Sequence, residues 1–373
     1  MIDVKEFFDS LRGAGVDRFC GVPDSLLKNI CAYISDNTTT SEHLITANEG
    51  SAIALAVGQY ITTKRPSLVY MQNSGFGNAI NPLLSLADAK VYGIPMVVMV
   101  GWRGEPGVKD EPQHIKQGEV MERLLDACDL PVVIIDSDTK SIDEVLKSAV
   151  ATAITNNNPV ILLVKKGAFG PYNLKNTMSD IAEWSREDAI KIIVEASGDD
   201  DIFVSTTGMA SRELFEIRVA NRQSHGNDFL TVGSMGHAAM IALGVAQNTT
   251  RHVFCIDGDG ASIMHLGNLT STGQSGSENL IHIILNNAAH DSVGGQPTCA
   301  DLINLPLIAK ACGYVSAKSV SKIDGILDYI EKIKRQPGPH LLEVKVRKGS
   351  RSELGRPTSS PVQNKEALMK VLG

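Results

Sequence analysis

Two short polar motifs combine residue types that can hold a divalent metal and a phosphate. Gly-Asp-Gly at 258–260 follows the largely apolar run 252–256, and Asn286-Asn287 follows the apolar run 281–285. If both runs are parallel strands, their carboxyl ends lie at one sheet edge, where ligands of such sheets bind. A carboxylate, a carboxamide oxygen and a backbone carbonyl suit Mg²⁺, which completes its shell with phosphate oxygens and water. The spacing therefore predicts that Asp259 and Asn287 hold a metal, and that the metal holds the phosphates.

Three further polar residues are candidates for catalysis. Glu49 opens the mostly apolar helical segment 50–62, where burying a charge is costly without a purpose. Asp24 follows the first predicted strand and His114 follows the fourth, so both acid–base candidates are expected at the same sheet edge as Glu49. Asp24 has a simpler alternative as the cap of the next helix. His114 has the alternative of an exposed histidine, since segment 101–118 is interpreted as a long polar loop.

These residues must be positioned by alternating strands and helices. Short, β-branched apolar runs are typical of parallel strands that are covered on both faces. The predicted strands are 18–22, 44–47, 67–71, 95–100, 131–135, 160–164, 202–205, 229–232, 252–256, 281–285 and 341–346. The predicted helices between them include 3–13, 50–62, 140–155, 186–196, 236–247 and 321–335. This alternation predicts an α/β fold of doubly wound parallel sheets.

The two halves of the chain repeat the same order of features. GSAIALAVGQ (50–59) is similar to GHAAMIALGVAQ (236–247), and each small-residue helix is followed by a strand and a glycine-rich turn. A repeat in this order predicts two domains of like fold, which can pair face to face around a ligand. We expect a domain at 1–170, a linker at 171–186 and a domain at 187–373, with no middle domain.

Composition argues against several classes of function. The 373 residues carry a formal net charge of −7, which gives no electrostatic support for nucleic-acid binding. No apolar run approaches the roughly 20 residues of a membrane helix, so no membrane partner is expected. The charged, amphipathic N-terminus is unlike a signal peptide, and the six cysteines are scattered. We therefore expect a cytoplasmic protein with reduced cysteines.

The strand–GDG–helix pattern, followed after residues 261–285 by Asn-Asn, resembles the diphosphate-binding motif of thiamine-diphosphate enzymes. The resemblance implies thiamine diphosphate and Mg²⁺ as cofactors, with Asp259, Asn287 and the carbonyl of Ala289 as metal ligands. It implies that Glu49 lies beside the pyrimidine ring, so that 1–170 is the pyrimidine-binding domain and 187–373 the diphosphate-binding domain. Met235 would prop the bent cofactor, and the Gly233 carbonyl would face its amino group. The other expected cofactor contacts are Thr207, Gly208, Gly258, Gly260, Ser292 and Val293.

The compact order of two domains resembles thiamine-diphosphate-dependent decarboxylases that release CO₂ and an aldehyde from a small anionic 2-oxo acid with a second acidic group. Phrases such as FCGVPDSLLK (19–28) favour a phosphonate as that group, and a sulfonate is the alternative. The expected substrate residues are Arg103 first, Arg356 from a mobile tail, and Asn73. A solvated charged loop is the simpler explanation of the charges around Arg103. The family also implies at least a homodimer, with the active site between subunits.

Other functions stay in competition with this interpretation. A thiamine-dependent carboligase would carry the same cofactor motifs. A non-catalytic cofactor-binding regulator is disfavoured because Glu49 and Asp259 are both present. A nicotinamide or nucleotide enzyme fits poorly, because Gly75-Phe76-Gly77 lacks the third glycine of a dinucleotide motif and the sequence has no GxxxxGK[ST] loop.

Overall fold

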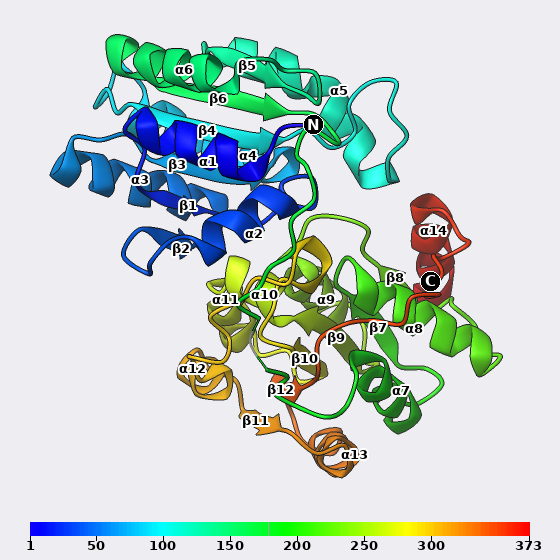
Figure 1. Cartoon of the computed structure of the whole chain (residues 1–373). Coiled ribbons are helices and arrows are strands. Elements are labelled where there is room, and N and C mark those ends of the chain that lie inside the picture. Colours follow the sequence, from blue (N-terminus) through cyan, green and yellow to red (C-terminus); the bar gives the residue numbers. More distant parts are fainter. Residues whose placement is uncertain (178) are drawn as a thin grey trace. The chain divides into compact units, whose positions relative to one another are not determined.

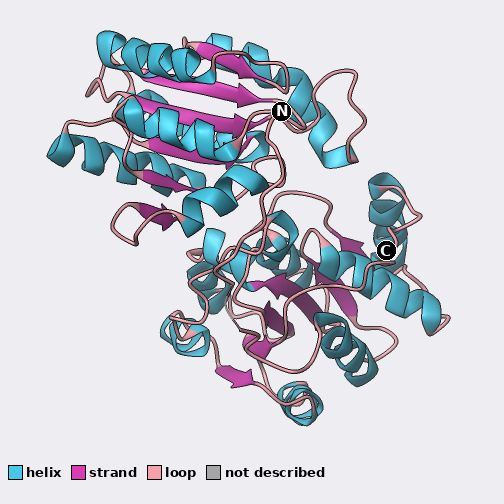
Figure 2. Ribbon diagram, viewed as in Figure 1, coloured by secondary structure: helices cyan, strands magenta, loops and turns pink. Residues whose placement is uncertain are grey.

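The computed structural model describes residues 1–177 and 179–373, which form two compact units. Unit 1 is Met1–Thr177 together with Ser292–Gln296, and unit 2 is 179–291 together with Pro297–Gly373. Each unit contains one six-stranded sheet with helices packed on it (Figures 1 and 2). All strand pairs in both sheets are parallel.

In unit 1 the strands lie in the order β2-β1-β3-β4-β6-β5. They are β1 (Phe19–Gly21), β2 (His43–Ile45), β3 (Leu68–Gln72), β4 (Met96–Gly101), β5 (Val132–Ile135) and β6 (Pro159–Val164). The α-helices are α1 (Val4–Gly13), α2 (Lys28–Asp36), α3 (Glu49–Thr63), α4 (Phe76–Pro82), α5 (Pro112–Ala127) and α6 (Ile142–Asn156). The short turn η1 (Asn73–Gly75) joins β3 to α4, and the π-helical η2 (Leu83–Ala87) continues α4.

In unit 2 the order is β11-β12-β10-β9-β7-β8. The strands are β7 (Ile202–Ser205), β8 (Asp228–Leu230), β9 (Val253–Gly258), β10 (Leu280–Asn286), β11 (Ser316–Val320) and β12 (His340–Lys345). The α-helices are α7 (Arg186–Ala196), α8 (Met209–Ala220), α9 (Ala238–Ala246), α10 (Asp259–Met264), α11 (Asn268–Gln274), α12 (Leu305–Ala311), α13 (Asp324–Ile333) and α14 (Pro361–Leu372). A 3-10 turn, η3 (Asp291–Val293), follows β10.

The two sheets have the same topology. Counted along each unit, both run in the strand order 2-1-3-4-6-5. The similar helices of the sequence repeat, α3 and α9, therefore hold equivalent positions, and so do β3 and β9, which lead into the glycine-rich turns. The prediction of two doubly wound α/β domains of like fold is confirmed. In each sheet the order reverses at the first strand, and ligands of such folds bind beyond the carboxyl ends of the strands at this point.

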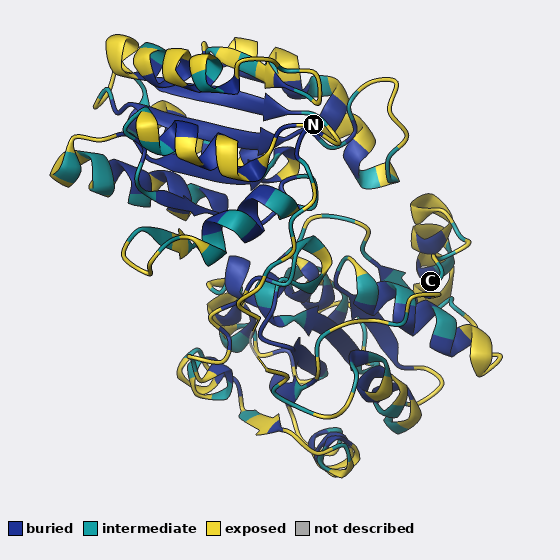
Figure 3. Cartoon of the chain, in the orientation of Figure 1, coloured by how far each residue is buried: buried dark blue, intermediate teal, exposed yellow. Residues whose placement is uncertain are grey.

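The central strands form the cores of both units. Strands β4, β6, β7 and β10 are buried along their whole length, and Figure 3 shows them in dark blue beneath helices with exposed outer faces. Their unbroken apolar sequences made them predictable. Strand β11 was not predicted, because it lies at a sheet edge and only Val320 of its residues is buried. Among the described residues, no helix combines the length and apolar character needed to cross a bilayer.

Candidate active site

Asp259 and Asn287 lie side by side at the carboxyl edge of the unit 2 sheet. Strands β9 and β10 are neighbours in parallel register, with Gly258 opposite Leu285, and each residue directly follows its strand. The backbone of Gly260 and of Asn287 lies beside the Asp259 carboxylate and favours its ionised form. The chain therefore brings the two predicted side-chain ligands to one place.

The carboxyl group of Asp259 is almost completely buried. Burial raises its pKa to about 6, although Thr298 Oγ1 donates a hydrogen bond to Oδ2 at 2.5 Å and favours the ionised form. A buried carboxylate beside a carboxamide and backbone carbonyls is an arrangement of hard oxygen donors that a divalent cation would neutralise. The residues present thus fit Mg²⁺.

The two adjacent asparagines differ in their contacts. Asn286 Nδ2 donates to Glu343 Oε1 at 2.6 Å, so this carboxamide is committed to β12. Asn287 Oδ1 accepts only the N–H of Ala289, at 3.1 Å, among its described side-chain contacts. The turn that follows them is tight, with a positive φ of 56° at Ala288. Asn287 is therefore the asparagine that is available to a metal.

The turns after β7 and β8, which hold four of the other predicted cofactor residues, lie at the same edge of the unit 2 sheet. Gly208 precedes α8 with a φ of 94°, and Thr207 Oγ1 donates to the Val232 carbonyl at 2.8 Å, which joins the turns after β7 and β8. Gly233 and Met235 lie in the second of these turns. Ser292 and Val293 lie in η3.

His290 was missed by sequence reasoning, although it lies three residues beyond Asn287. A Cβ atom placed on Gly260 would lie 3.3 Å from His290 Cε1 and 3.5 Å from Met235 Cε, so these three residues are in contact. Burial lowers the pKa of His290 to about 4, which keeps the imidazole neutral. Gly260 thus packs closely against His290 and Met235 at the turn that carries Asp259.

In unit 1, Glu49 is the first residue of α3 and is buried. Its Oε2 accepts a hydrogen bond from Asn78 Nδ2 at 2.8 Å, and a side chain at Gly75 would collide with its carboxylate. Burial raises the pKa of Glu49, against the effect of the Asn78 hydrogen bond. The helix is capped by Asn48, which accepts the N–H of Ser51, so Glu49 is not needed as the cap.

Asp24 is completely buried beyond the end of β1. Oδ2 accepts the N–H of Leu26 at 2.9 Å, whereas Oδ1 has no hydrogen-bond partner. Burial raises the pKa of Asp24 to about 6, and the nearby Arg103 lowers it by a smaller amount. Helix α2 begins at Lys28 and has no side-chain cap of its own, so Asp24 caps the turn that leads into the helix rather than its first residue.

Arg103 follows β4, and its guanidinium is paired with Asp110. Nε donates to Asp110 Oδ2 at 2.7 Å, Nη2 contacts Oδ1, and Nη1 donates to Ser25 Oγ at 2.7 Å. The Asn73 amide donates to the Arg103 carbonyl at 2.8 Å and accepts its N–H at 3.1 Å. Asn73 is thus engaged in holding the Arg103 backbone. The carboxylate of Asp110 therefore compensates part of the positive charge of Arg103.

The interpretation of segment 101–118 as a loop is wrong for its second half. His114 lies in the first turn of α5 and is buried, with Nδ1 unpartnered. The buried positions His114, Gly118, Met121 and Leu125 follow helical spacing, but a histidine and a glycine on the inner face concealed this pattern. Burial lowers the pKa of His114, with a smaller contribution from Arg103.

The expectation of a mobile tail is also wrong for residues 351–355. Arg351 pairs with Glu187 and Glu216, and Arg212 of α8 contacts the carbonyls of Leu354 and Gly355. Leu354 is buried. Arg356 follows this anchored stretch and is exposed in unit 2.

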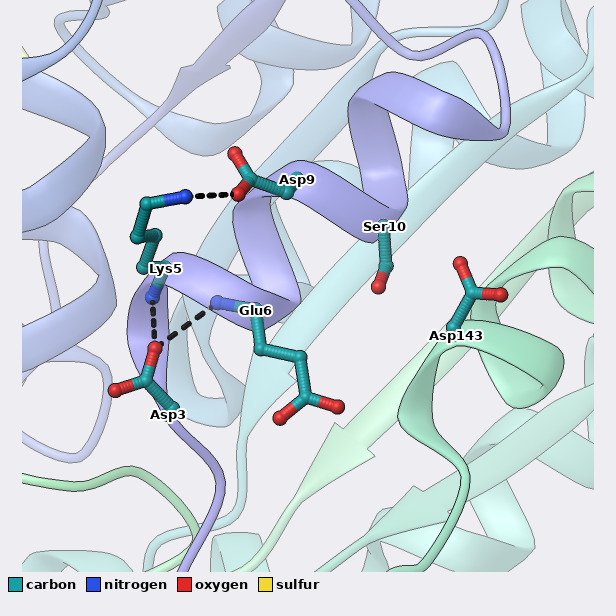
Figure 4. Close-up of a pocket in the computed structure, with 6 residues that line it drawn as sticks. All are labelled: Asp3, Lys5, Glu6, Asp9, Ser10 and Asp143. Atoms are coloured by element: carbon teal, nitrogen blue, oxygen red, sulfur yellow. Dashed lines mark hydrogen bonds and ion pairs between the residues drawn. The ribbon is translucent and has the colours of Figure 1, made fainter.

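Two other clusters of polar side chains contain none of the predicted site residues. Cys255, Asp257 and His282 are buried on β9 and β10, with His282 Nδ1 at 3.1 Å from the Tyr314 hydroxyl. A surface hollow along α1 is lined by Asp3, Lys5, Glu6, Asp9, Ser10 and Asp143 (Figure 4). Asp3 there caps α1, and Lys5 pairs with Asp9 at 2.5 Å, so these side chains stabilise the helix itself.

Comparison with known proteins gives matches over both units. The description "Thiamine pyrophosphate enzyme, N-terminal TPP binding domain" matches residues 4–127, and the corresponding C-terminal TPP binding domain matches residues 206–344. The chain belongs to the thiamine pyrophosphate enzymes.

Relatives that match nearly the whole chain belong to a narrower group of these enzymes. The chain is 34% identical to the phosphonopyruvate decarboxylase of Streptomyces viridochromogenes, over 97% of this chain and 93% of the relative. It is 34% identical to that of Streptomyces hygroscopicus, over 97% and 92%. It is 27% identical to the sulfopyruvate decarboxylase of Methanosarcina acetivorans, over 95% and 94%. Its relatives within the family are thus named as decarboxylases of 2-oxo acids.

Proposed function

We propose that this chain converts 3-phosphonopyruvate to phosphonoacetaldehyde and CO₂, with thiamine diphosphate and Mg²⁺ as cofactors, in phosphonate biosynthesis. The observation that carries the proposal is the 34% identity to two phosphonopyruvate decarboxylases over nearly the whole chain. The buried carboxylate of Asp259 beside Asn287 supports the cofactor part, because it supplies the oxygen donors that Mg²⁺ requires.

In this proposal each unit has its own share of the cofactor. Asp259, Asn287 and the carbonyl of Ala289 hold Mg²⁺. The turn at Thr207–Gly208 contacts the diphosphate, and the turn at Gly233–Met235 supports the bent conformation of the cofactor. Glu49 hydrogen-bonds the pyrimidine ring. Bound thiamine diphosphate would supply the electron sink for the electron pair that stays on the substrate carbon when CO₂ departs. Because Glu49 and Asp259 belong to different units, a homodimer that shares its active sites is the assembly implied by the family.

The chain itself must supply one proton, because loss of CO₂ leaves a carbon that takes up H⁺ before the aldehyde is released. Asp24 suits this role, since a pKa of about 6 lets it donate and recover a proton near neutral pH. His114 lies beyond the end of β4, which β3 separates from β1, and its imidazole, whose pKa is lowered by burial, can orient the substrate by hydrogen bonding. The Arg103–Asp110 pair presents a fixed guanidinium to the acidic groups of the substrate.

The test is an assay of the purified protein with thiamine diphosphate and Mg²⁺, supplied separately with phosphonopyruvate, sulfopyruvate and pyruvate. We expect CO₂ and aldehyde release to be fastest with phosphonopyruvate and to stop when EDTA removes the metal. Faster turnover of sulfopyruvate would establish the alternative, which the similarity to a sulfopyruvate decarboxylase favours second. Coupled products in place of the free aldehyde would identify a carboligase.

A further inference from the structure

Thr298 makes a hydrogen bond whose direction is set by its surroundings. Its Oγ1 lies 2.5 Å from Asp259 Oδ2 and also accepts the N–H of Ala300 at 3.3 Å. Both Thr298 and Asp259 are buried, with exposed fractions of 8% and 3%. An ionised carboxylate can only accept, so the Thr298 hydroxyl donates its one hydrogen to Asp259 and uses a lone pair to accept the N–H of Ala300.

The backbone of Thr298 is joined to the segment that follows Asn287. Its N–H donates to the Ala288 carbonyl at 3.0 Å, and the neighbouring Pro297 forms an isolated antiparallel bridge with Ala289. Residues 287–298 therefore leave the sheet edge at one predicted ligand and return beside another. Thr298 closes this loop against Asp259.

We propose that Thr298 is a positioning residue for the metal, which fixes the orientation of the Asp259 carboxylate and ties it to the loop bearing Asn287 and Ala289. The inference rests on the proposed function, because it assumes that these three residues bind Mg²⁺. Groups that hydrogen-bond to a metal ligand typically contribute about 10–100-fold to metal affinity. The sequence motifs did not point to Thr298, because this residue lies far along the chain from the GDG turn.

The test measures Mn²⁺ binding by electron paramagnetic resonance, in the presence of thiamine diphosphate and without substrate. Thr298→Val keeps the shape of the side chain and removes the hydroxyl, so we expect Mn²⁺ affinity to fall by about 10–100-fold. Thr298→Ser restores the hydroxyl and should keep affinity close to that of the unaltered protein. Thr272→Val is the matched control, because it removes a buried hydroxyl that lies beside Tyr314.

The outcomes separate three explanations. Unchanged Mn²⁺ affinity in Thr298→Val, or equal losses in Thr298→Val and Thr298→Ser, would overturn the role of the hydroxyl. Equal losses in Thr298→Val and Thr272→Val would assign the effect to general damage of the core and overturn it as well. Absence of Mn²⁺ binding by the unaltered protein would instead refute the proposed cofactor site, on which the inference depends.

Discussion

At the scale of single residues, three carboxyl groups are buried where strands end. They are Asp24, Glu49 and Asp259, and burial raises the pKa of each. An ionised carboxylate in such a place lowers stability, because the unfolded chain solvates it better. Buried carboxylates with raised pKa values concentrate at functional sites, because catalysis needs proton donors and acceptors whose pKa values differ from those in water.

Replacing Asp24 by Asn should separate stability from activity. The folded pKa of Asp24, about 6, lies above its ordinary value of 3.8, so the unfolded chain ionises first as the pH rises. The free energy of unfolding of the unaltered protein should therefore fall by about 1–3 kcal/mol between about pH 4 and pH 6. Asp24→Asn lacks this decrease, so it should gain relative stability over that window while losing decarboxylation.

Urea unfolding at several pH values, together with a CO₂ assay, tests this prediction. If the difference in the free energy of unfolding between Asp24→Asn and the unaltered protein stays constant from about pH 4 to pH 7, Asp24 does not titrate in this range. Full activity in Asp24→Asn would remove Asp24 as the proton donor.

Replacing Glu49 by Gln should abolish most activity without weakening the fold. Gln can still accept the hydrogen bond from Asn78 but cannot exchange a proton, so kcat should fall by about 10²–10⁴-fold. The free energy of unfolding at neutral pH should not fall, because the substitution removes a buried carboxyl group whose ionisation is unfavourable in the folded chain. Glu6→Gln is a matched control, since Glu6 also lies in the first turn of a helix but is exposed. Decarboxylation at the native rate in Glu49→Gln would contradict the role given to Glu49.

At the scale of elements, two glycines allow helix α5 to pack closely against the segment that follows β4. A side chain at Gly118 would collide with the Gly104 carbonyl, and Trp102 Nε1 donates to the Gly118 carbonyl at 3.1 Å. Gly104 itself has a φ of 71° and lies against the His114 carbonyl. This close approach fixes the start of α5, and with it His114, relative to Arg103 at the end of β4.

Gly118→Ala should therefore disturb both stability and substrate binding. Forcing a methyl group into this contact should lower the free energy of unfolding by about 1–3 kcal/mol, because the helix must move away. The same movement should raise KM more than it changes cofactor affinity. Gly58→Ala provides the control, because a Cβ there meets no atom within 4 Å and helix propensity favours Ala by up to about 1 kcal/mol. If Gly118→Ala has the KM and stability of Gly58→Ala, the docking argument fails.

At the scale of the whole molecule, the predicted cofactor residues are divided between two units of the same topology. Glu49 belongs to unit 1, and Asp259 and Asn287 belong to unit 2. The proposed function requires residues of both units for each active site. If subunits share their sites, as the family implies, two inactive variants can restore one another.

Mixing Glu49→Gln and Asp259→Asn subunits tests this assembly. Each variant alone should be inactive, because every site carries the change. A hybrid dimer has one doubly altered site and one unaltered site, so random reassociation should restore about a quarter of full activity. The recovery is measured after mild dissociation and reassembly, with each variant reassembled alone as the control. A mixture that stays inactive while hybrids are present would show that each chain completes its own site.

The sequence by itself determined the type of fold and the location of the turn that is proposed to bind the metal. Largely apolar runs predict buried parallel strands, and Asp259 and Asn287 lie within three residues of the ends of two such runs, so their meeting at one edge was predictable from local order. Edge strand β11 and helix α5 were not predictable in this way, because partial burial in one and small or polar inner residues in the other weaken the periodic signal.

Only the tertiary structure decided which side chains meet across long sequence separations. Thr298 reaches Asp259 across 39 residues, Asn73 holds the backbone of Arg103 across 30, and Arg212 holds the carbonyl of Leu354 across 142. Spacing along the chain carries no record of these contacts, because they arise when separate strand ends converge and the loops between them close. For the same reason, the raised pKa values of Asp24 and Asp259 follow from burial in the folded chain rather than from neighbouring residues in the sequence.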